Sequence, residues 1–555
     1  MMEKMPPLPP REHEAKPDGA AWPLSRRAAV PELVPPGFVP PGMSVDGPAA
    51  APEGFRGEWV TDEGRRGPFG VASGILHGLP DAVAVPADAD DVAALVRWAS
   101  SRDVKLIPRG AGTGMPGGNV GRGASVDLVT HFGEPLRIDA GARTAAIGVG
   151  LTLARVNAAA AAHGLQFPVD PSSGERATFG GIIANNSGGS HTVRYGSTRA
   201  WVQALDMVLA DGTRVRTERG ERERHPRLAA ILAEVDAALA PHAGAIAARW
   251  PKVRKNSSGY ALKEYLESGD AVDLLVGSEG TLGLVTQAVA RLAPVPAARG
   301  LALLEFTELA AAGAAVERIL ELRPATCEII DRTFIDLVRS GADDPGYPLR
   351  EGLEAILFVE FEAATEDEVA AAMERLRALA AGVADRVTRA EDEAQRERFW
   401  HVRHAASPLI AKLAGNRISM QFIEDGVVPV SRLADYIRLL RRVLGERGLP
   451  AVIFGHAGDG NLHVNPLVDV AKLGWREEIE AVVYEIAEGV AALGGTMSGE
   501  HGDGRLRAPL IETIFGAEIV GCFRAVKAAF DPAGILNPGV ILPLPGQRPL
   551  EAIRY

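Results

Sequence analysis

The sequence predicts an α+β protein with two main domains, and three observations support this prediction. Its 555 residues are several times the roughly 150 residues of a typical domain. Short apolar runs typical of strands alternate along the chain with segments whose apolar residues recur at helical spacing. The order of these segments changes after the prolines at Pro294 and Pro296, which indicates a domain boundary.

The composition excludes several classes of protein. With 46% hydrophobic and 23% charged residues, the chain is neither disordered nor fibrous. Its 71 acidic and 59 basic residues argue against a nucleic-acid binder, which needs basic patches. No apolar run approaches the roughly 20 residues that cross a bilayer, so we expect a chain that is not integral to a membrane. Cys327 and Cys522 cannot supply the four thiolates of an iron–sulfur cluster, and they fit a reducing cytosol.

Residues 1–60 are predicted to be a proline-rich arm. Thirteen of the 39 prolines fall in the first 52 residues, and proline fixes φ and removes a hydrogen-bond donor. We therefore expect an extended stretch with no role in chemistry. It lacks the charged start and apolar core of a signal peptide.

Residues 61–296 are predicted to form the first domain. Apolar spacing predicts one helix that begins at Asp90, which can cap it, and a second helix at 151–162. Strands are expected at 105–108, 125–128, 136–139 and 144–149, and a strand with a tight turn at 204–212.

Residues 297–520 are predicted to form a second α+β domain. Strands are expected at 301–306, 327–330 and 355–361, with a hairpin around Asp459. Helices are expected at 308–322, 366–381, 433–447 and 475–493. Strand–helix units of this length fit a sheet with one face covered by helices.

A glycine-dense segment, "PRGAGTGMPGGN" at 108–119, follows an apolar strand directly. Such density indicates either a flexible linker or a backbone that approaches a ligand closely. Because a strand precedes it, we favour a loop whose N–H groups bind a diphosphate. A Rossmann fingerprint is rejected, since the segment continues into another strand and not into a helix.

Two further segments of small residues, 169–196 and 277–292, also lie beside apolar strands. Any one of the three is typical of an irregular surface loop. Three such segments in one domain instead favour one long ligand that is bound at several points along its length.

These three segments resemble the motifs of the FAD-binding domain of the vanillyl-alcohol-oxidase (PCMH-type) family. The first is similar to its P-x-RGxGTGxxGG pyrophosphate loop. The second, with "GGIIANNSGG" and "RYG", is similar to GG-x-x-ATNAGG and RYG, and the third to GSEGTLG. The resemblance covers about residues 75 to 545. It implies a two-part FAD-binding domain with an α+β substrate cap, and a C-terminal segment, 521–555, that returns to the FAD domain.

The same resemblance implies the residues that bind FAD. They are Pro108, Arg109, Gly110, Ala111, Gly112, Thr113, Gly114, Gly117, Gly118, Ser172, Thr178, Gly181, Asn185, Val285 and Asn537. Asn185 stands where the family usually has threonine. Members that attach FAD covalently have a histidine or cysteine in the first loop, and this chain has neither there, so non-covalent FAD is expected.

Three histidines lie in two short segments of unusual composition. In "AVIFGHAGDGNLHVNP", His456 and His463 can meet across a hairpin, and strand alternation puts Asn465 on the same face as His463. In "GGTMSGEHGDGRLR", Glu500 and His501 lie in a glycine-rich turn. Two imidazoles and a carboxylate suit a divalent metal. The alternative is a pair of buried histidines at a hairpin, with the Glu-His pair in a solvated turn.

These two segments resemble the signature of FAD-linked D-2-hydroxyacid dehydrogenases. The resemblance implies that His456, His463 and Glu500 bind Zn²⁺ or Mn²⁺ and that His501 is the base. It further implies that Arg403 and Asn465 bind the substrate. Some members have a lysine about fifteen residues after that arginine, and here Lys412 or Arg417 could take its place.

The resemblance implies oxidation of a D-2-hydroxy acid of the D-lactate, D-2-hydroxyglutarate or glycolate type, with hydride transfer to the flavin N5. The electrons would then pass to an external acceptor, namely a quinone, an electron-transfer flavoprotein or an iron–sulfur subunit. We expect a cytoplasmic location. Peripheral binding at the inner face of the membrane and the formation of a homodimer are both left open. The alternatives are a non-redox enzyme of the alkylglycerone phosphate synthase type and a flavoprotein subunit of a larger iron–sulfur complex.

Overall fold

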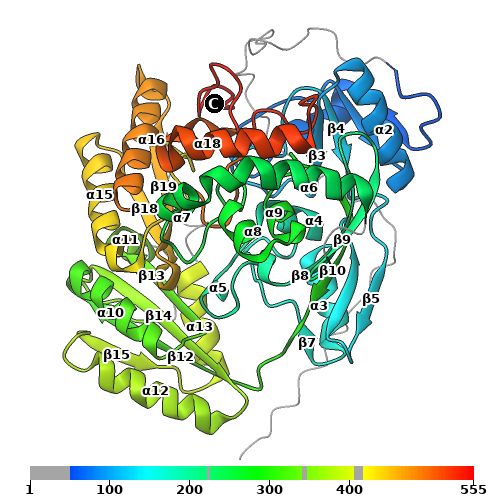
Figure 1. Cartoon of the computed structure of the whole chain (residues 1–555). Helices are drawn as coiled ribbons and strands as arrows, with labels where there is room; N and C mark the ends of the chain where they lie inside the picture. Colours follow the sequence, from blue (N-terminus) through cyan, green and yellow to red (C-terminus); the bar gives the residue numbers. More distant parts are fainter. Residues whose placement is uncertain (1–49, 222–224, 341–346, 405–416) are drawn as a thin grey trace, which may run out of the picture. The chain divides into compact units, whose positions relative to one another are not determined.

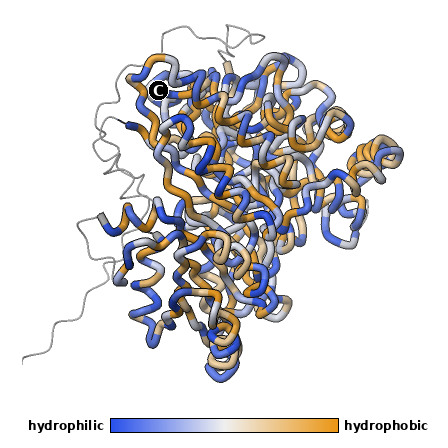
Figure 2. The backbone as a smooth tube through the Cα atoms, turned by 90° about the vertical axis from the view of Figure 1, so that its left-hand side faces the viewer, coloured by the Kyte–Doolittle hydropathy of each residue, from blue (hydrophilic) through white to orange (hydrophobic). Residues whose placement is uncertain are grey.

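The computed structural model of the chain describes residues 50–221, 225–340, 347–404 and 417–555 (Figure 1). The unit from Val39 to Arg554 contains the three main sheets. Hydrophobic and hydrophilic stretches alternate along its helices and strands (Figure 2), as elements with one buried and one exposed face require.

A four-stranded sheet carries the first glycine segment at the end of β3. The strand order is β1-β2-β4-β3, with β2, β4 and β3 parallel. The bounds are Glu58–Val60 (β1), Ala82–Val85 (β2), Leu106–Arg109 (β3) and Ala124–Asp127 (β4). Helix α2 (Ala89–Arg102) buries the expected apolar face. Its cap is Asp88, whose carboxylate accepts the N–H groups of Asp90 and Asp91, so the predicted cap at Asp90 is wrong: Asp88 is the extended residue before the first turn.

A five-stranded antiparallel sheet carries the other two glycine segments. Its strand order is β5-β6-β10-β8-β9. The bounds are Leu136–Asp139 (β5), Thr144–Gly148 (β6), Val202–Val208 (β8), Arg214–Glu218 (β9) and Leu284–Arg291 (β10). The second segment contains α4 (Phe179–Asn185), which contacts β6 and β10, and the third leads into β10. Helix α3 (Leu153–Ala161) precedes the second segment.

The third sheet has eight antiparallel strands in the order β15-β12-β14-β13-β18-β19-β16, and β17 also pairs with β19. The bounds are Ala298–Phe306 (β12), Thr326–Asp331 (β13), Ala355–Ala363 (β14), Arg386–Arg389 (β15), Arg417–Ser419 (β16), Gly426–Val427 (β17), Ala451–His456 (β18) and Asn461–Asp469 (β19). Its strands agree with those predicted from 301 onward.

Helices cover both faces of this sheet. On one face, Phe334 of α11 (Arg332–Ser340) and Phe399 of α13 (Glu393–His404) belong to the same buried cluster as Leu303 and Phe358 of the strands. On the other face, α12 (Glu366–Ala380) packs against β12 and β14, and α10 (Leu309–Glu321) packs beside it. The sequence predicted helices on one face, so the second covered face is a correction. Its cause is the apolar side chains that alternate onto both faces of β12 and β14.

A series of packed helices links the eight-stranded sheet to the five-stranded one (Figure 1). Helix α15 (Leu433–Glu446) packs on α16 (Trp475–Ala492), α16 on α18 (Ile511–Phe530), and α18 on α6 (Pro226–Leu239). After α18 the chain comes back to the first sheet, where Leu536 bridges Leu106 of β3. The glycine segments and the β18–β19 hairpin are thereby held within one packed unit.

One helical stretch among the described residues, Pro226–Arg249, is long and apolar enough to cross a membrane by length and composition. Its larger apolar side chains, such as Ile231 and Val235, are buried in the same core cluster as α18. A single stretch of this kind is weak evidence for a membrane span.

Candidate active site

A single large cavity of about 810 Å³ brings the two groups of predicted site residues together. One side, here called the glycine wall, comes from residues 108–119, 170–190 and 275–285. Another part of the lining, here called the histidine wall, consists of Arg403, Glu424, His456, His463, Asn465, Glu500 and His501. The predicted residues that line the glycine wall are Pro108, Arg109, Gly110, Ala111, Gly112, Thr113, Gly114, Gly118, Ser172, Thr178, Gly181, Asn185 and Val285.

Two of the residues expected at the flavin lie behind the glycine wall. Gly117 packs closely against Leu76, because a Cβ on this glycine would lie only 2.8 Å from the Leu76 Cδ1. Asn537 is buried, and its amide donates to the carbonyls of Gly118 (2.8 Å) and Glu279 (2.9 Å). Both residues support the backbone of the wall from outside the cavity.

The glycine wall presents backbone at positions where a side chain would not fit. Gly112 has φ +77°, and a Cβ there would collide with the guanidinium of Arg109. That guanidinium donates to the carbonyls of Asn119 (3.1 Å), Pro68 (3.2 Å) and Val71 (2.8 Å). Burial lowers the pKa of Arg109 to about 10. Arg109 thus holds the loop in its conformation through backbone carbonyls.

The β18–β19 hairpin brings the two predicted histidines together, as the sequence predicted. The Nε2 atoms of His456 and His463 lie 3.2 Å apart. The Oε1 atom of Glu500 lies 3.0 Å from the first and 3.4 Å from the second. All three residues are buried. Two ligands of one cation with bonds of 2.0–2.2 Å are separated by roughly 3 to 3.5 Å, so these three atoms have the spacing of a coordination site.

Two buried glutamates, which the sequence analysis missed, accept hydrogen bonds from the other ring nitrogens. The Nδ1 of His456 lies 2.7 Å from Glu328 of β13, and the Nδ1 of His463 lies 2.7 Å from Glu424. Both Nε2 lone pairs then face each other, an arrangement that needs a cation or a proton between them. An acidic residue inside the apolar strand "TCEIID" was the available signal for Glu328.

The charges around the hairpin shift several pKa values. Burial opposes ionisation of Glu328, but His456 and Arg403 outweigh it and lower the pKa of that carboxyl to about 2. Burial likewise favours neutral His456, yet Glu328 and Glu500 raise its pKa to about 9. Surroundings that stabilise a positive charge on the His456 ring also suit a bound cation.

Lys255 is a second residue that the sequence analysis missed. Its fully buried ammonium lies 2.5 Å from the Oε2 atom of Glu500 and 3.2 Å from the Asn461 side-chain oxygen. Gly188 of the second glycine segment packs against this pair, and a Cβ on it would lie 2.7 Å from the Glu500 Oε2. Residue 188 must therefore be glycine, because a side chain there would displace Glu500 of the histidine wall.

His501, Arg403 and Asn465 also line the cavity. His501 stacks on His463 with ring centroids 5.5 Å apart, and its Nδ1 lies 2.8 Å from Glu424. Burial would lower the pKa of His501, but Glu424 and Asp425 raise it to about 9. Arg403 donates twice to Glu328 (2.7 and 3.1 Å) and lies over the Phe454 ring. Lys412 lies outside the described residues, and Arg417 is exposed on β16, away from the cavity lining.

The sequence matches two domain families. Residues 80–218 match an FAD binding domain, and residues 295–541 match the C-terminal domain of FAD-linked oxidases.

Named relatives cover most of the chain. The glycolate oxidase subunit GlcD of Bacillus subtilis is 32% identical over 83% of this chain and 89% of its own length. The D-lactate dehydrogenase of Archaeoglobus fulgidus is 32% identical over 83% and 91%. The D-2-hydroxyglutarate dehydrogenase of Pseudomonas putida is 31% identical over 88% of this chain, which spans 51% of that longer protein.

Solved structures share the fold. The 4-ethylphenol oxidase of Gulosibacter chungangensis superposes with a TM-score of 0.64 at 18% identity, over 87% of this chain and 94% of its own. An alkyldihydroxyacetonephosphate synthase superposes with a TM-score of 0.61 at 17% identity, over 90% and 87%. Together with the FAD binding domain match, these likenesses confirm the predicted α+β fold with a PCMH-type FAD-binding domain.

Proposed function

This chain belongs to the family of FAD-linked oxidases and is an FAD-binding oxidoreductase, and from that premise we propose that it oxidises a D-2-hydroxy acid to the 2-oxo acid. Relatives named for glycolate, D-lactate and D-2-hydroxyglutarate support a substrate of that class. The observation that carries the proposal is the cavity itself, which the glycine wall lines together with two imidazoles and a carboxylate at the spacing of a coordination site.

The glycine wall fits the cofactor. Gly181 lines the cavity, and a Cβ there would meet only the Thr178 Oγ1, at 3.5 Å, so this part of the wall leaves space for a ligand. FAD, when bound, supplies the acceptor for two electrons. The first segment contains no histidine or cysteine between residues 108 and 119, which supports non-covalent binding.

His456, His463 and Glu500 would hold a divalent cation, Zn²⁺ or Mn²⁺. Their convergent Nε2 and Oε1 atoms fit such an ion, and the Nδ1 hydrogen bonds to Glu328 and Glu424 fix the rings as in other metal sites. A cation there supplies a Lewis acid, which lowers the pKa of a substrate hydroxyl.

The chain's own residues would bind the substrate and accept its proton. Arg403 and Asn465 line the cavity beside the histidines and suit the substrate carboxylate, because guanidinium and amide groups donate to it. Neutral His501 would take the hydroxyl proton on Nε2, since its Nδ1 is directed at Glu424. The positive charge of a nearby bound cation would lower the raised pKa of this ring and so favour its neutral form.

We also propose that the electrons leave to an acceptor outside the chain, since its two cysteines cannot hold an iron–sulfur cluster. A quinone, an electron-transfer flavoprotein or an iron–sulfur subunit would serve, with the protein in the cytoplasm. The synthase of similar fold supports no competing activity, because a 17% identity shows the fold alone.

Anaerobic flavin reduction tests the proposal. D-lactate, D-2-hydroxyglutarate and glycolate are each mixed with the protein, beside the L enantiomers of the chiral acids, with and without a chelator. We expect at least one of the D acids or glycolate to bleach the flavin, the L acids to leave it oxidised, and the chelator to stop bleaching until Zn²⁺ or Mn²⁺ is restored. Bleaching that survives removal of all metal would contradict the role of the cation. An oxidised flavin with every acid would contradict the reaction.

A further inference from the structure

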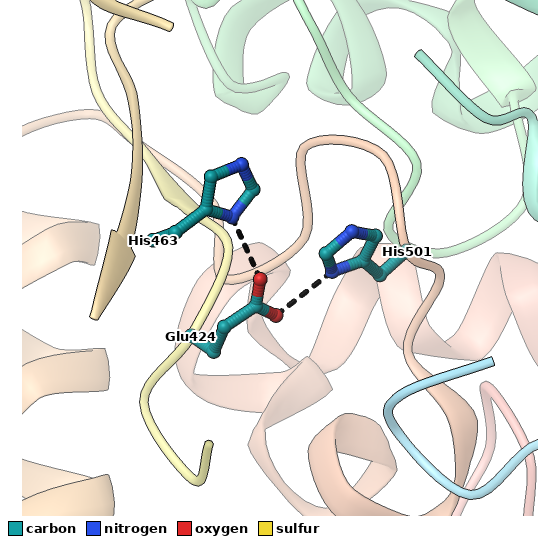
Figure 3. Close-up of side chains that lie close together, drawn as sticks. All are labelled: Glu424, His463 and His501. Atoms are coloured by element: carbon teal, nitrogen blue, oxygen red, sulfur yellow. Dashed lines mark hydrogen bonds and ion pairs between the residues drawn. The ribbon is translucent and has the colours of Figure 1, made fainter. Parts of the chain in front are cut away.

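Glu424 contacts two functionally different histidines with its two carboxylate oxygens (Figure 3). Oε1 lies 2.7 Å from the Nδ1 of His463, and Oε2 lies 2.8 Å from the Nδ1 of His501. The glutamate side chain is buried. In the proposed function, His463 is a cation ligand and His501 is the base, so one carboxylate contacts both.

Arg507 fixes Glu424 in this position. The guanidinium is buried, and its Nη2 donates to the Glu424 Oε2 (2.9 Å) and to the Glu424 main-chain oxygen (2.7 Å). Its Nη1 donates to the carbonyl of Gly502, next to His501 (2.6 Å). Oε2 therefore receives two donors, Arg507 and His501.

Glu424, His463 and His501 each offer one possible ligand atom, and these three atoms are close enough together to hold a metal ion. Two observations argue against a metal at this second position. Separations of 2.7 and 2.8 Å are hydrogen-bond lengths, whereas neighbouring ligands of one cation lie roughly 3 to 3.5 Å apart. Arg507 also donates to the same carboxylate and brings a positive charge to the place that a cation would take. Glu424 is better explained as an acceptor for both rings.

An ionised carboxylate only accepts hydrogen bonds, so both Nδ1 atoms must carry a proton. In the neutral imidazoles both Nε2 atoms are then free to accept. We propose that Glu424 is a positioning residue that sets His463 and His501 in the same tautomer, so that cation binding and proton acceptance depend on one side chain. The inference rests on the proposed function, which assigns the two histidines their roles.

Glu328 is the counterpart at the other histidine. It accepts from the Nδ1 of His456 with one oxygen and from Arg403 with the other. It therefore connects a cation ligand to the residue proposed to bind the substrate carboxylate. Of these two glutamates, Glu424 is the one that connects a cation ligand to the base.

Substitution by glutamine and by alanine separates the two effects of Glu424. In Glu424→Gln the amide oxygen takes the place of Oε2, because Arg507 and His501 both donate there. The NH₂ group then faces His463, whose Nδ1 must accept and whose Nε2 becomes protonated. We expect affinity for Zn²⁺ to fall about 10- to 100-fold, while saturating Zn²⁺ restores the rate of flavin reduction.

In Glu424→Ala neither ring is held. We expect flavin reduction at saturating Zn²⁺ to remain at least about 100-fold slower than in the wild type, with the Kd for substrate unchanged.

The measurements are Zn²⁺ content in chelator buffers, flavin content, and the rate of anaerobic flavin reduction against substrate concentration. Glu305→Gln is the matched control, because Glu305 is a fully buried carboxylate that accepts from Tyr347 and Arg350 and has no histidine partner. We expect wild-type Zn²⁺ affinity and rate for it. Should the alanine variant fail to bind flavin, the Zn²⁺ affinity of the glutamine variant decides.

Wild-type Zn²⁺ affinity in Glu424→Gln would overturn the inference, as would a wild-type reduction rate in Glu424→Ala once Zn²⁺ saturates. These results differ from a failure of the proposed function. In that case the wild-type protein itself would retain no cation or would not be reduced by any 2-hydroxy acid, and the inference would fall with it.

Discussion

The two walls of the cavity are built in different ways. The glycine wall presents main-chain atoms, and its one buried guanidinium, that of Arg109, is occupied with backbone carbonyls. The histidine wall presents side chains, and buried charges hold its three proposed cation ligands: Glu328 holds His456, Glu424 holds His463 and Lys255 holds Glu500. A wall of backbone tolerates few side chains, whereas a wall of charges depends on partners that lie elsewhere in the sequence.

The walls also support each other where they meet. Glu279 of the third glycine segment accepts the N–H groups of Asp503 and Gly504, just after His501 (2.7 and 3.0 Å). Burial and the nearby Asp503 raise the pKa of Glu279 to about 8. Arg505 donates to the Gly117 carbonyl behind the first segment (2.9 Å). A change in one wall can therefore disturb the other only at specific contacts.

The largest expected effect comes from the base on the histidine wall. His501→Ala removes the proton acceptor, so we expect flavin reduction by the substrate to slow about 10²- to 10⁴-fold. Bound flavin should stay at the wild-type level, because the glycine wall is untouched. Stopped-flow absorbance and a flavin-to-protein ratio measure the two quantities. An unchanged rate would show that another group accepts the proton.

Gly188→Ala tests the place where the walls touch. Its new methyl would lie 2.7 Å from the Glu500 Oε2 and collide with Lys255, so Glu500 must move. We expect affinity for Zn²⁺ to fall about 10-fold or more, although residue 188 belongs to a glycine segment. Zn²⁺ content at graded chelator concentrations measures the loss. Loss of flavin with unchanged Zn²⁺ affinity would mean that Gly188 serves the cofactor instead.

Gly181→Ala affects the glycine wall alone. The protein has room for the methyl, whose nearest neighbour, the Thr178 Oγ1, is an ordinary 3.5 Å away. The methyl instead enters the cavity, and we expect weaker FAD binding by about 1 kcal/mol, or roughly fivefold. Fluorescence titration of the apoprotein with FAD checks this, with Zn²⁺ affinity as the internal control. Equal loss of both ligands would contradict a separation between the walls.

The smallest effect on the reaction is expected from His191, which lies outside both walls. Its Nδ1 is 2.7 Å from Asp170, and its Nε2 is 3.3 Å from Glu360 of β14. Burial favours neutral His191, but Asp170 and Glu360 raise its pKa to about 11. The folded pKa lies above the unfolded value of about 6.5. The stabilisation is therefore complete below pH 6.5 and declines as the pH rises toward 11.

We expect His191→Gln to lower the free energy of unfolding by about 1.5–3 kcal/mol near pH 6.5, with a smaller difference from wild type at pH 9.5. Urea unfolding at the two pH values measures it, and flavin reduction should change little. A stability difference that grows with pH would contradict the assigned charge on His191.

Sequence patterns predicted the strands and helices well where periodicity was strong, as in α15 and α16. They also predicted that His456 and His463 meet, because a hairpin with a short turn fixes its own register. Glu424 and Lys255 could not be predicted in this way. Glu424 stands next to Asp425 and Lys255 next to Arg254, so the sequence does not show which charge of each pair enters the site. The partner of each is set by the packing of distant elements.

The residue pattern alone shows where the backbone approaches a ligand, since glycine is needed wherever a Cβ would collide, and it shows which short segments carry imidazoles and carboxylates. Which ring nitrogen is available depends on how the chain folds. The acceptors at Nδ1 come from 128 residues away for His456 and 39 residues away for His463. Such partners follow from the order of strands in a sheet and from the packing of loops against that sheet. Neither can be predicted from the local spacing of residues.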